Sequence, residues 1–295
     1  MLGPLVSCLL LIGSQRTGTR YTLDAMEAEL GRSGAQTFFH PGEPFSGLSF
    51  GGYPDFGSKV IHKFSSKTGV EGDVESVPDW VGIKIMYSQG ISKWGSRLVP
   101  DLANSTACGC KVHVVHLQRR NKLAQWISVK SNKQDKALVA RQRKAKGDLD
   151  RAPDDRHVAH PTSKEDAALV LARTASMRLS TAGLVRQLET LLREDLMVAA
   201  AWGQAFEDPP VDLPYFPLYY EDLTLAWSQL CSFLHAGSSA NDCATRQPPD
   251  SNHTRIHEPT EHTLHDMIAN GDEVADALRG TRFEWMAREL GAYND

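Results

Sequence analysis

The chain has 295 residues and a formal net charge of −4, with 41% hydrophobic and 23% charged residues. A chain of this length can bury a sizeable core, as one large α/β domain or as two small ones. With this net charge the protein as a whole does not attract anions, which argues against nucleic acid and membrane surfaces as partners. A site for an anion must therefore be formed by a local group of basic residues. No apolar run reaches the roughly 18 residues that a membrane-spanning helix requires.

The first residues, Met1 to Ile12, are apolar but lack the basic start and the small-residue cleavage site of a signal peptide. We interpret residues 5–12 as the first core strand. The compartment stays open: the cytoplasm if Met1 is the native start, or the Golgi lumen if a membrane anchor precedes it. The five cysteines do not form a disulfide framework at this length, and the sequence leaves open whether Cys231 and Cys243 pair.

Hydrophobic periodicity predicts strands that alternate with helices along the chain. This alternation indicates an α/β fold in three layers, with a central parallel sheet flanked by helices on both faces. The predicted strands cover residues 5–12, 79–87, 111–117 and 216–223, and the predicted helices cover 21–30, 121–129, 181–206, 226–234 and parts of 263–290.

Two segments are predicted to lie outside the regular elements. Residues 40–57 are rich in Gly, Pro, Ser and Phe, which is typical of an ordered loop beside a site. Residues 130–166 are polar and charged, and we interpret them as a solvated, mobile excursion from a single domain that spans 1–295. The alternative for this excursion is a lid or an acceptor-binding segment.

The stretch from Ser14 to Arg20, SQRTGTR, connects the first predicted strand with the first predicted helix. A glycine-containing turn at this position offers backbone N–H groups and the positive end of the helix dipole to an anion. Gly18 permits the tight turn, Arg16 supplies a permanent bidentate cation, and hydroxyl side chains add further donors. The alternative is an ordinary turn with a surface arginine.

The loop lacks the features of two common nucleotide sites. A nucleoside-triphosphate site needs a Lys followed by a Mg²⁺-binding Ser or Thr, and a dinucleotide site needs GxGxxG. Neither pattern occurs here. A donor whose transferred group needs no metal fits the loop better, and sulfuryl transfer from a phosphosulfate is one such reaction.

Residues 114–132 contain the end of another predicted strand, then two arginines, and then a predicted helix. This order places cations and a helix N-terminus at the carboxyl edge of the sheet. Ser128 lies eight residues after Arg120, so both can approach one phosphate only if Arg120 precedes the helix. The alternative is a basic helix start with a solvated Ser128.

The two stretches together resemble the sulfotransferases that use 3'-phosphoadenosine 5'-phosphosulfate (PAPS), and within them the branch that sulfates trehalose and nodulation factors. That branch opens with SQRSGST, where this chain has SQRTGTR. The segments VGIKIMYSQ at 81–89, YYEDL at 219–223 and MIANGDEVADALRGT at 267–281 are also similar to family motifs. The similarity covers most of the chain except 130–166 and implies a P-loop-type fold.

The resemblance implies a role for each segment. A metal-free site would bind PAPS as the sulfuryl donor, and the acceptor would be a hydroxyl of a small molecule or glycan, such as a carbohydrate or glycolipid. The 3'-phosphate is implied to lie at Arg120 and Ser128, with Arg255 as a candidate from a last basic segment that has no clear match. The residues implied to hold the 5'-phosphosulfate are Ser14, Gln15, Arg16, Thr17, Gly18, Thr19 and Arg20, where Arg20 replaces the family's usual Thr.

Sulfuryl transfer to an alcohol needs a base that removes the hydroxyl proton. The resemblance places a carboxylate in a Gly-Glu-Pro setting, which residues 42–44 match, so Glu43 is the first choice. His40 is the competing base, because its ring titrates near neutral pH. Arg16 is expected to stabilise the charge that builds on the leaving oxygen.

Two charged features near predicted strands have more than one interpretation. Lys84 either orients the donor or acceptor or is a solvated lysine at a strand end. The pair Glu221-Asp222 is expected to cap the following helix and support the sheet edge rather than to bind a metal.

Two other functions stay open from the sequence. A P-loop kinase of a small molecule would need ATP and Mg²⁺, and the missing Lys-Ser/Thr pair counts against it. A catalytically degenerate nucleotide-binding protein of the same fold would bind adenosine 3',5'-bisphosphate and transfer nothing.

Overall fold

The computed structural model describes two compact units. The first comprises Met1–Arg120 and Arg193–Ser251, and the second comprises Asn121–Leu192 and Asn252–Asp295. The assignment of 1–295 to one domain stays a prediction. The residues that the structure describes, and to which all statements below refer, are 6–14, 17–39, 79–87, 110–146, 172–207, 214–235, 243, 245–248 and 263–291.

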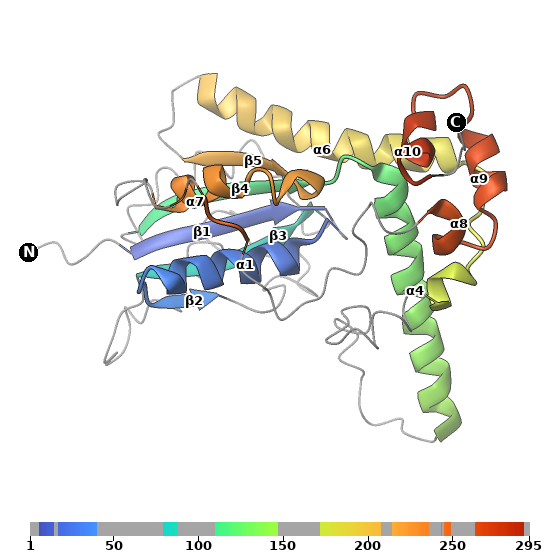
Figure 1. Ribbon diagram of the computed structural model, residues 1–295, viewed down its shortest axis with the longest axis horizontal. Coiled ribbons are helices and arrows are strands. Elements are labelled where there is room, and N and C mark those ends of the chain that lie inside the picture. Colours follow the sequence, from blue (N-terminus) through green and yellow to red (C-terminus); the bar gives the residue numbers. More distant parts are fainter. Residues whose placement is uncertain are drawn as a thin grey trace, which may run out of the picture. The chain divides into compact units, whose positions relative to one another are not determined.

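The first unit is built on a five-stranded, all-parallel sheet with the strand order β2-β3-β1-β4-β5 (Figure 1). This confirms the predicted α/β class with a central parallel sheet. Four of the strands were predicted, and the edge strand β2 was not. The strands are β1 (Val6–Gly13), β2 (Thr37–Phe39), β3 (Trp80–Met86), β4 (Cys110–Gln118) and β5 (Tyr215–Tyr219).

The central strands are apolar on both faces. β1 reads VSCLLLIG, and its residues from Cys8 to Ile12 are completely buried. Every residue of β3 is buried as well. Such near-continuous apolar runs are typical of parallel strands that are covered on both sides, because helices lie over each face.

Helices from different parts of the chain cover the two faces of this sheet. On one face, α1 (Thr19–Arg32) and α7 (Trp227–Leu234) pack their apolar residues against β1, β4 and β5 in a single core cluster. On the other face, Asp195 of α6 (Leu184–Glu207) forms a hydrogen bond with Tyr87, which follows β3. This arrangement is compatible with a three-layer α/β fold.

The chain leaves the central strands β1 and β4 in opposite directions. After β1 it passes through α1 to β2, on the β3 side of the sheet, whereas after β4 it continues to β5 on the other side. The carboxyl ends of β1 and β4 are aligned, since Gly13 pairs with Leu117. Ligands of open parallel sheets bind at such a switch point, outside the carboxyl ends of the strands.

The second unit is helical. It contains α4 (Lys122–Lys146), the first part of α6, α8 (Leu264–Met267), α9 (Gly271–Leu278) and α10 (Glu284–Glu289). Its core joins apolar residues of these helices, including Leu123, Leu188, Leu264, Leu278 and Phe283. The predicted terminal helices are confirmed.

The helix α4 is longer than predicted. It begins at Lys122, where the side-chain oxygen of Asn121 accepts a hydrogen bond of 2.9 Å from the N–H of Ala124. It then continues to Lys146 instead of ending at residue 129, so the first part of the predicted excursion 130–166 is helical. Residues 133–146 consist mainly of Lys, Gln, Arg, Ala and Leu, which have high helix propensity. The segment has no apolar stripe, so hydrophobic periodicity does not predict this part of the helix. None of the described helices is long and apolar enough to cross a membrane.

Candidate functional site

The turn between β1 and α1 lies at the switch point and is tightly built. The hydroxyl of Thr17, which is fully buried, donates a hydrogen bond of 2.8 Å to the carbonyl of Ser14. A Cβ at Gly13 would lie 2.8 Å from Cγ2 of Thr19 and 2.9 Å from Oγ1 of Thr17. The strand can therefore turn this sharply only because position 13 has no side chain.

The N-terminus of α1 faces this turn and has no capping side chain. Its N-cap residue is Gly18, with φ 80° and ψ 17°, and no side chain among the described residues hydrogen-bonds to this end of the helix. The first turn contains no acidic residue. The first N–H groups of a helix have no acceptor within the helix, and the helix dipole is positive there. This end of α1 is therefore suited to an anion.

Tyr220 covers one side of the turn. A Cβ at Gly18 would lie only 2.2 Å from Cε2 of the Tyr220 ring. The guanidinium of Arg119 lies over the ring of this tyrosine, 5.5 Å from the ring centroid. Tyr220 begins the 3₁₀ helix Tyr220–Asp222, directly after β5. The turn, the end of β5 and the end of β4 therefore meet at one place.

Two arginines follow β4 and differ in their surroundings. Arg119 is buried, with its Nε 3.7 Å from Oε1 of Glu221. Arg120 is 44% exposed, its guanidinium pairs with Asp222, and its backbone N–H donates a hydrogen bond of 2.9 Å to Glu221. The hydrogen bond that the Arg120 guanidinium donates to Asp222 raises the pKa of Arg120 above its usual value. Arg120 also lies 4.8 Å from the ring centroid of Tyr219.

These ion pairs correct the prediction for Glu221 and Asp222. The helix α7 is not capped by either carboxylate, because its N-cap is Ala226 and no side chain hydrogen-bonds there. Both carboxylates instead face the arginines of the neighbouring strand end. The physical reason is that β5 pairs with β4 in parallel, with Gln118 beside Tyr219, so the residues that follow the two strands emerge side by side.

The structure brings together some of the predicted donor residues. Ser14, Thr17, Gly18 and Thr19 form the turn and the start of α1. Arg20 instead lies along α1 and forms an ion pair of 3.0 Å with Asp24. Gln15, Arg16, His40, Glu43 and Arg255 lie outside the described residues.

The predicted 3'-phosphate residues lie in different units. Arg120 belongs to the first unit and precedes α4, which starts at Lys122. Ser128 is buried on α4 in the second unit. The alternative of a solvated Ser128 is therefore wrong.

Lys84 is also buried, which excludes the solvated lysine. It is 7% exposed and lies on β3, beside Leu11 of β1. By strand alternation its side chain lies on the same face as that of Met86. The sulfur of Met86 is 3.9 Å from the hydroxyl of Thr19. Lys84 thus lies on the face of the sheet that α1 covers.

Arg119 and Tyr220 were missed by the sequence reasoning. Strand alternation in 111–119 places Arg119 on the same face as Leu117 and Val115, toward α1, and this signal favours Arg119 over Arg120 as the buried arginine. No comparable signal exists for Tyr220, because its position over Gly18 depends on the strand order.

A second buried polar cluster lies on the opposite face. The ring nitrogens of His116 hydrogen-bond to the hydroxyls of Tyr87 and Tyr215, the latter at 2.7 Å. Burial raises the pKa of both tyrosines, and the hydrogen bond with Asp195 raises that of Tyr87 further. We interpret this cluster as a structural link between β3, β4 and β5, since its polar atoms satisfy one another.

The comparisons with protein families and curated proteins do not assign a function to this site. Neither a scan against protein-family models nor a search of curated proteins finds a match to the chain. The site is therefore interpreted from its geometry and its motifs. Its chemistry is that of an anion site: a glycine turn, an uncapped helix N-terminus and two arginines held by two carboxylates.

Proposed function

We propose that the chain is a P-loop-type sulfotransferase that transfers the sulfuryl group of PAPS to a hydroxyl of a carbohydrate or glycolipid. One observation carries the proposal: the glycine turn and the uncapped N-terminus of α1 lie at the switch point, where Tyr220 lies against Gly18 and the guanidinium of Arg119 lies 5.5 Å from the centroid of the Tyr220 ring. An anion held at the turn would meet the backbone N–H groups of this helix end.

In this proposal the two phosphate groups of the donor are held by different segments. The turn from Ser14 to Arg20 holds the 5'-phosphosulfate, and Arg120 holds the 3'-phosphate. Since Arg120 is paired with Asp222, donor binding requires Arg120 to exchange this carboxylate for a phosphate. Such an exchange costs little, because exposed ion pairs contribute about 0.2–1 kcal/mol.

The reaction is an in-line displacement at sulfur. Glu43 removes the proton of the acceptor hydroxyl, with His40 as the competing base, and the acceptor oxygen forms a bond to sulfur. The bond between sulfur and the bridging phosphate oxygen breaks, which releases adenosine 3',5'-bisphosphate and a sulfate ester. Arg16 and the N-terminus of α1 stabilise the negative charge that develops on the bridging oxygen.

A second candidate function is nucleotide binding without transfer. The observation that favours it is that Glu221 and Asp222 already neutralise both arginines. In a sulfotransferase these carboxylates position the arginines until the donor binds. In a degenerate protein they would replace the phosphate permanently.

A thermal-shift titration with adenosine 3',5'-bisphosphate, ADP, and ATP with Mg²⁺ tests the donor site first. We expect a selective, metal-independent rise in melting temperature, equivalent to about 2.7 kcal/mol at a ligand concentration of 100 Kd. The variant Arg120→Ala should lose this rise. Arg178→Ala is the matched control, because Arg178 is also an exposed arginine paired with a carboxylate, Glu273, but lies in the second unit.

Transfer is then measured with ³⁵S-labelled PAPS and a panel of sugar and glycolipid acceptors. Labelled sulfate ester that is lost in Glu43→Gln supports the proposed base, whereas loss only in His40→Ala assigns the base to His40. Nucleotide binding without labelled product from any acceptor would favour the degenerate protein. A preference for ATP with Mg²⁺ would overturn the sulfotransferase.

A further inference from the structure

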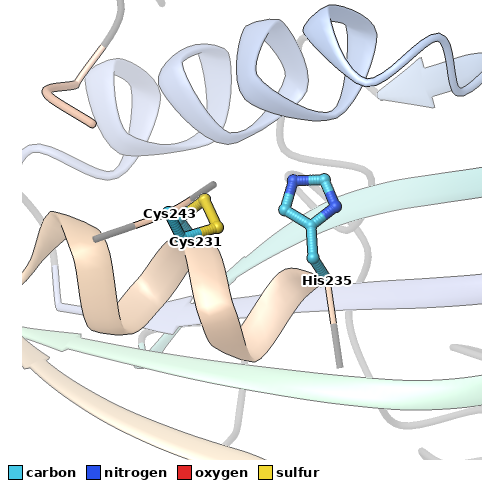
Figure 2. A group of neighbouring side chains, drawn as sticks. All are labelled: Cys231, His235 and Cys243. Carbon is cyan, nitrogen blue, oxygen red and sulfur yellow. A yellow bond between two sulfur atoms is a disulfide. The ribbon is translucent and has the colours of Figure 1, made fainter. Parts of the chain in front are cut away.

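A cluster of metal-ligating side chains lies between α7 and α1, and the proposed function does not use it. Cys231 and His235 are four residues apart at the end of α7, so they lie on one face of the helix. Cys243 joins them from the following segment, and one ligand atom of each of the three residues lies within 4.8 Å of the others. Figure 2 shows the imidazole of His235 beside the sulfurs of Cys231 and Cys243, which are bonded to each other as a disulfide.

Glu29 of α1 brings a fourth ligand to the same place. Its side chain is completely buried, and its Oε1 lies 3.5 Å from Sγ of Cys231 and 3.7 Å from Nε2 of His235. The same oxygen pairs with the guanidinium of Arg246. A buried carboxylate requires positive charge beside it. The ionisable groups of this cluster come from three separate segments of the chain.

The spacing of these atoms fits a tetrahedral zinc ion. With Zn–S bonds of about 2.3 Å and Zn–N or Zn–O bonds of about 2.0 Å, the ligands of a tetrahedral site are separated by about 3.3–3.8 Å. The separations of Glu29 from Cys231 and from His235 lie within this range. The ligand atoms of Cys231, His235 and Cys243 lie within 4.8 Å of one another, and the two sulfurs are closer than zinc needs because they are covalently bonded. Breaking that bond would allow them to separate to the distance that zinc needs.

The surrounding charges also suit such an ion. Two thiolates and one carboxylate are compensated by Zn²⁺ together with the guanidinium of Arg246, which stays beside Glu29 as an outer partner, and the half-exposed Arg32 lies 3.5 Å from the other oxygen of Glu29. Sulfur and imidazole ligands favour Zn²⁺ over Mg²⁺ or Ca²⁺. Both cysteines are buried, as expected of a closed structural site rather than an open catalytic one.

We propose that the reduced protein binds one Zn²⁺ ion through Cys231, Cys243, His235 and Glu29, and that the disulfide is the oxidised, metal-free form of the same site. A dithiol reductant supplies two electrons and two protons to the disulfide and is itself oxidised to a disulfide. The two protein thiols then release two protons as they bind Zn²⁺. The site thus contains a disulfide under oxidising conditions and a bound Zn²⁺ ion under reducing conditions.

The test is a metal titration of the full chain after reduction with a phosphine and removal of metals. Titration with Co²⁺ should give one tetrahedral cobalt centre per chain, with sulfur-to-cobalt charge-transfer absorption, and Zn²⁺ should displace it. The oxidised protein should bind neither ion. Because even outer partners of a metal site typically change affinity by about 10–100-fold, His235→Ala and Glu29→Gln should each weaken binding by at least about tenfold.

Matched variants separate this site from the other cysteines. Cys231→Ser with Cys243→Ser should abolish the charge-transfer absorption, whereas Cys108→Ser with Cys110→Ser should leave it unchanged. Because the cysteine variants lose the disulfide, His235→Ala provides a protein that still forms it and can be checked for folding in the oxidised state. In the reduced wild-type protein, Zn²⁺ should slow alkylation of Cys231 and Cys243.

Three outcomes would overturn the proposal. The first is a reduced protein that binds no Co²⁺ or Zn²⁺, and the second is a cobalt spectrum that survives the loss of Cys231 and Cys243. The third is equal alkylation of these cysteines with and without Zn²⁺. None of these measurements involves a nucleotide, so the proposal is tested independently of the sulfotransferase activity.

Discussion

The ring of Tyr220 lies where a side chain at residue 18 would project, so Gly18 and Tyr220 together fix the shape of the anion turn. A Cβ at Gly18 would be 2.2 Å from the ring, and the backbone there has a φ of 80°. Two separate requirements therefore exclude other residues from this position: the left-handed backbone and the contact with the ring.

Substitution of Gly18 should destabilise the protein more than substitution of an equivalent glycine. Gly34 has a φ of 82° and no atom within 4 Å of an added Cβ, so Gly34→Ala measures the backbone cost alone, about 1–2 kcal/mol. Gly18→Ala should cost about 1–3 kcal/mol more, because the ring must also move. Urea unfolding measures both. Tyr220→Ala should reduce the excess cost in the double variant, and equal costs for the two glycines would refute the contact.

Removal of Asp222 should strengthen nucleotide binding if Arg120 holds a phosphate. The Arg120–Asp222 pair is partly exposed, so its loss should raise the affinity for adenosine 3',5'-bisphosphate by up to about fivefold, the equivalent of about 1 kcal/mol. Calorimetric titration of Asp222→Ala measures this change. Glu273→Ala removes a similar exposed partner from Arg178 in the second unit and should have no effect. Weaker binding in Asp222→Ala would show that the carboxylate positions Arg120 productively.

His113 should make the protein less stable in mild acid. Its ring lies 4.9 Å from that of Trp80 and 5.6 Å from that of Phe233, and its Nδ1 has no hydrogen-bond partner among the described residues. Burial, with a smaller effect of Lys111, lowers the pKa of His113 from 6.5 to about 4. Between these values the unfolded chain binds a proton that the folded chain does not, so stability falls as the pH falls.

The loss from His113 should reach about 2 kcal/mol between pH 7.5 and pH 5, at about 1.36 kcal/mol per pKa unit. Urea unfolding at the two pH values measures it. His113→Leu should remove this part of the pH dependence, and His265→Ala, an exposed histidine, should leave it in place. An unchanged pH dependence in His113→Leu would contradict the assignment.

Reduction without metal should lower the free energy of unfolding. The Cys231–Cys243 disulfide closes a loop with a sequence separation of 12, and the chain-entropy model gives about 3 kcal/mol for such a loop. Urea unfolding with and without a phosphine reductant measures the difference. The double variant Cys231→Ser, Cys243→Ser should not respond to the reductant. A response of equal size in this variant would assign the effect to other cysteines.

The sequence predicted the elements whose pattern is local. The continuous apolar run VSCLLLIG identifies β1, and the leucines spaced three and four apart identify α6. In both elements, burial selects apolar residues that are close together in the sequence. The strand β2 has only the three residues Thr37–Phe39, which is too short to show a period. The extension of α4 to Lys146 has helix propensity but no apolar stripe, so its polarity was interpreted as a lack of structure.

The candidate site was predicted only in part, because its residues come from distant segments. The turn after β1 is recognisable from Gly18 and its hydroxyl neighbours. The pairing of Arg119 with Glu221 and of Arg120 with Asp222 joins segments about 100 residues apart and follows from β4 and β5 being neighbours. Strand order is a property of the whole sheet, and single-sequence patterns do not encode it.

The central place of β1 has a consequence for synthesis of the chain. β1 is made before both of its neighbours, which begin at Trp80 and Cys110. A ribosome that adds about 5–20 residues per second needs about 5–20 s to complete β4 after β1. During this time the leucine-rich β1 lacks at least one of its sheet partners, and its unpaired edge can join that of another nascent chain. We therefore expect the yield of native protein to depend on chaperones that shield β1 until β4 has emerged.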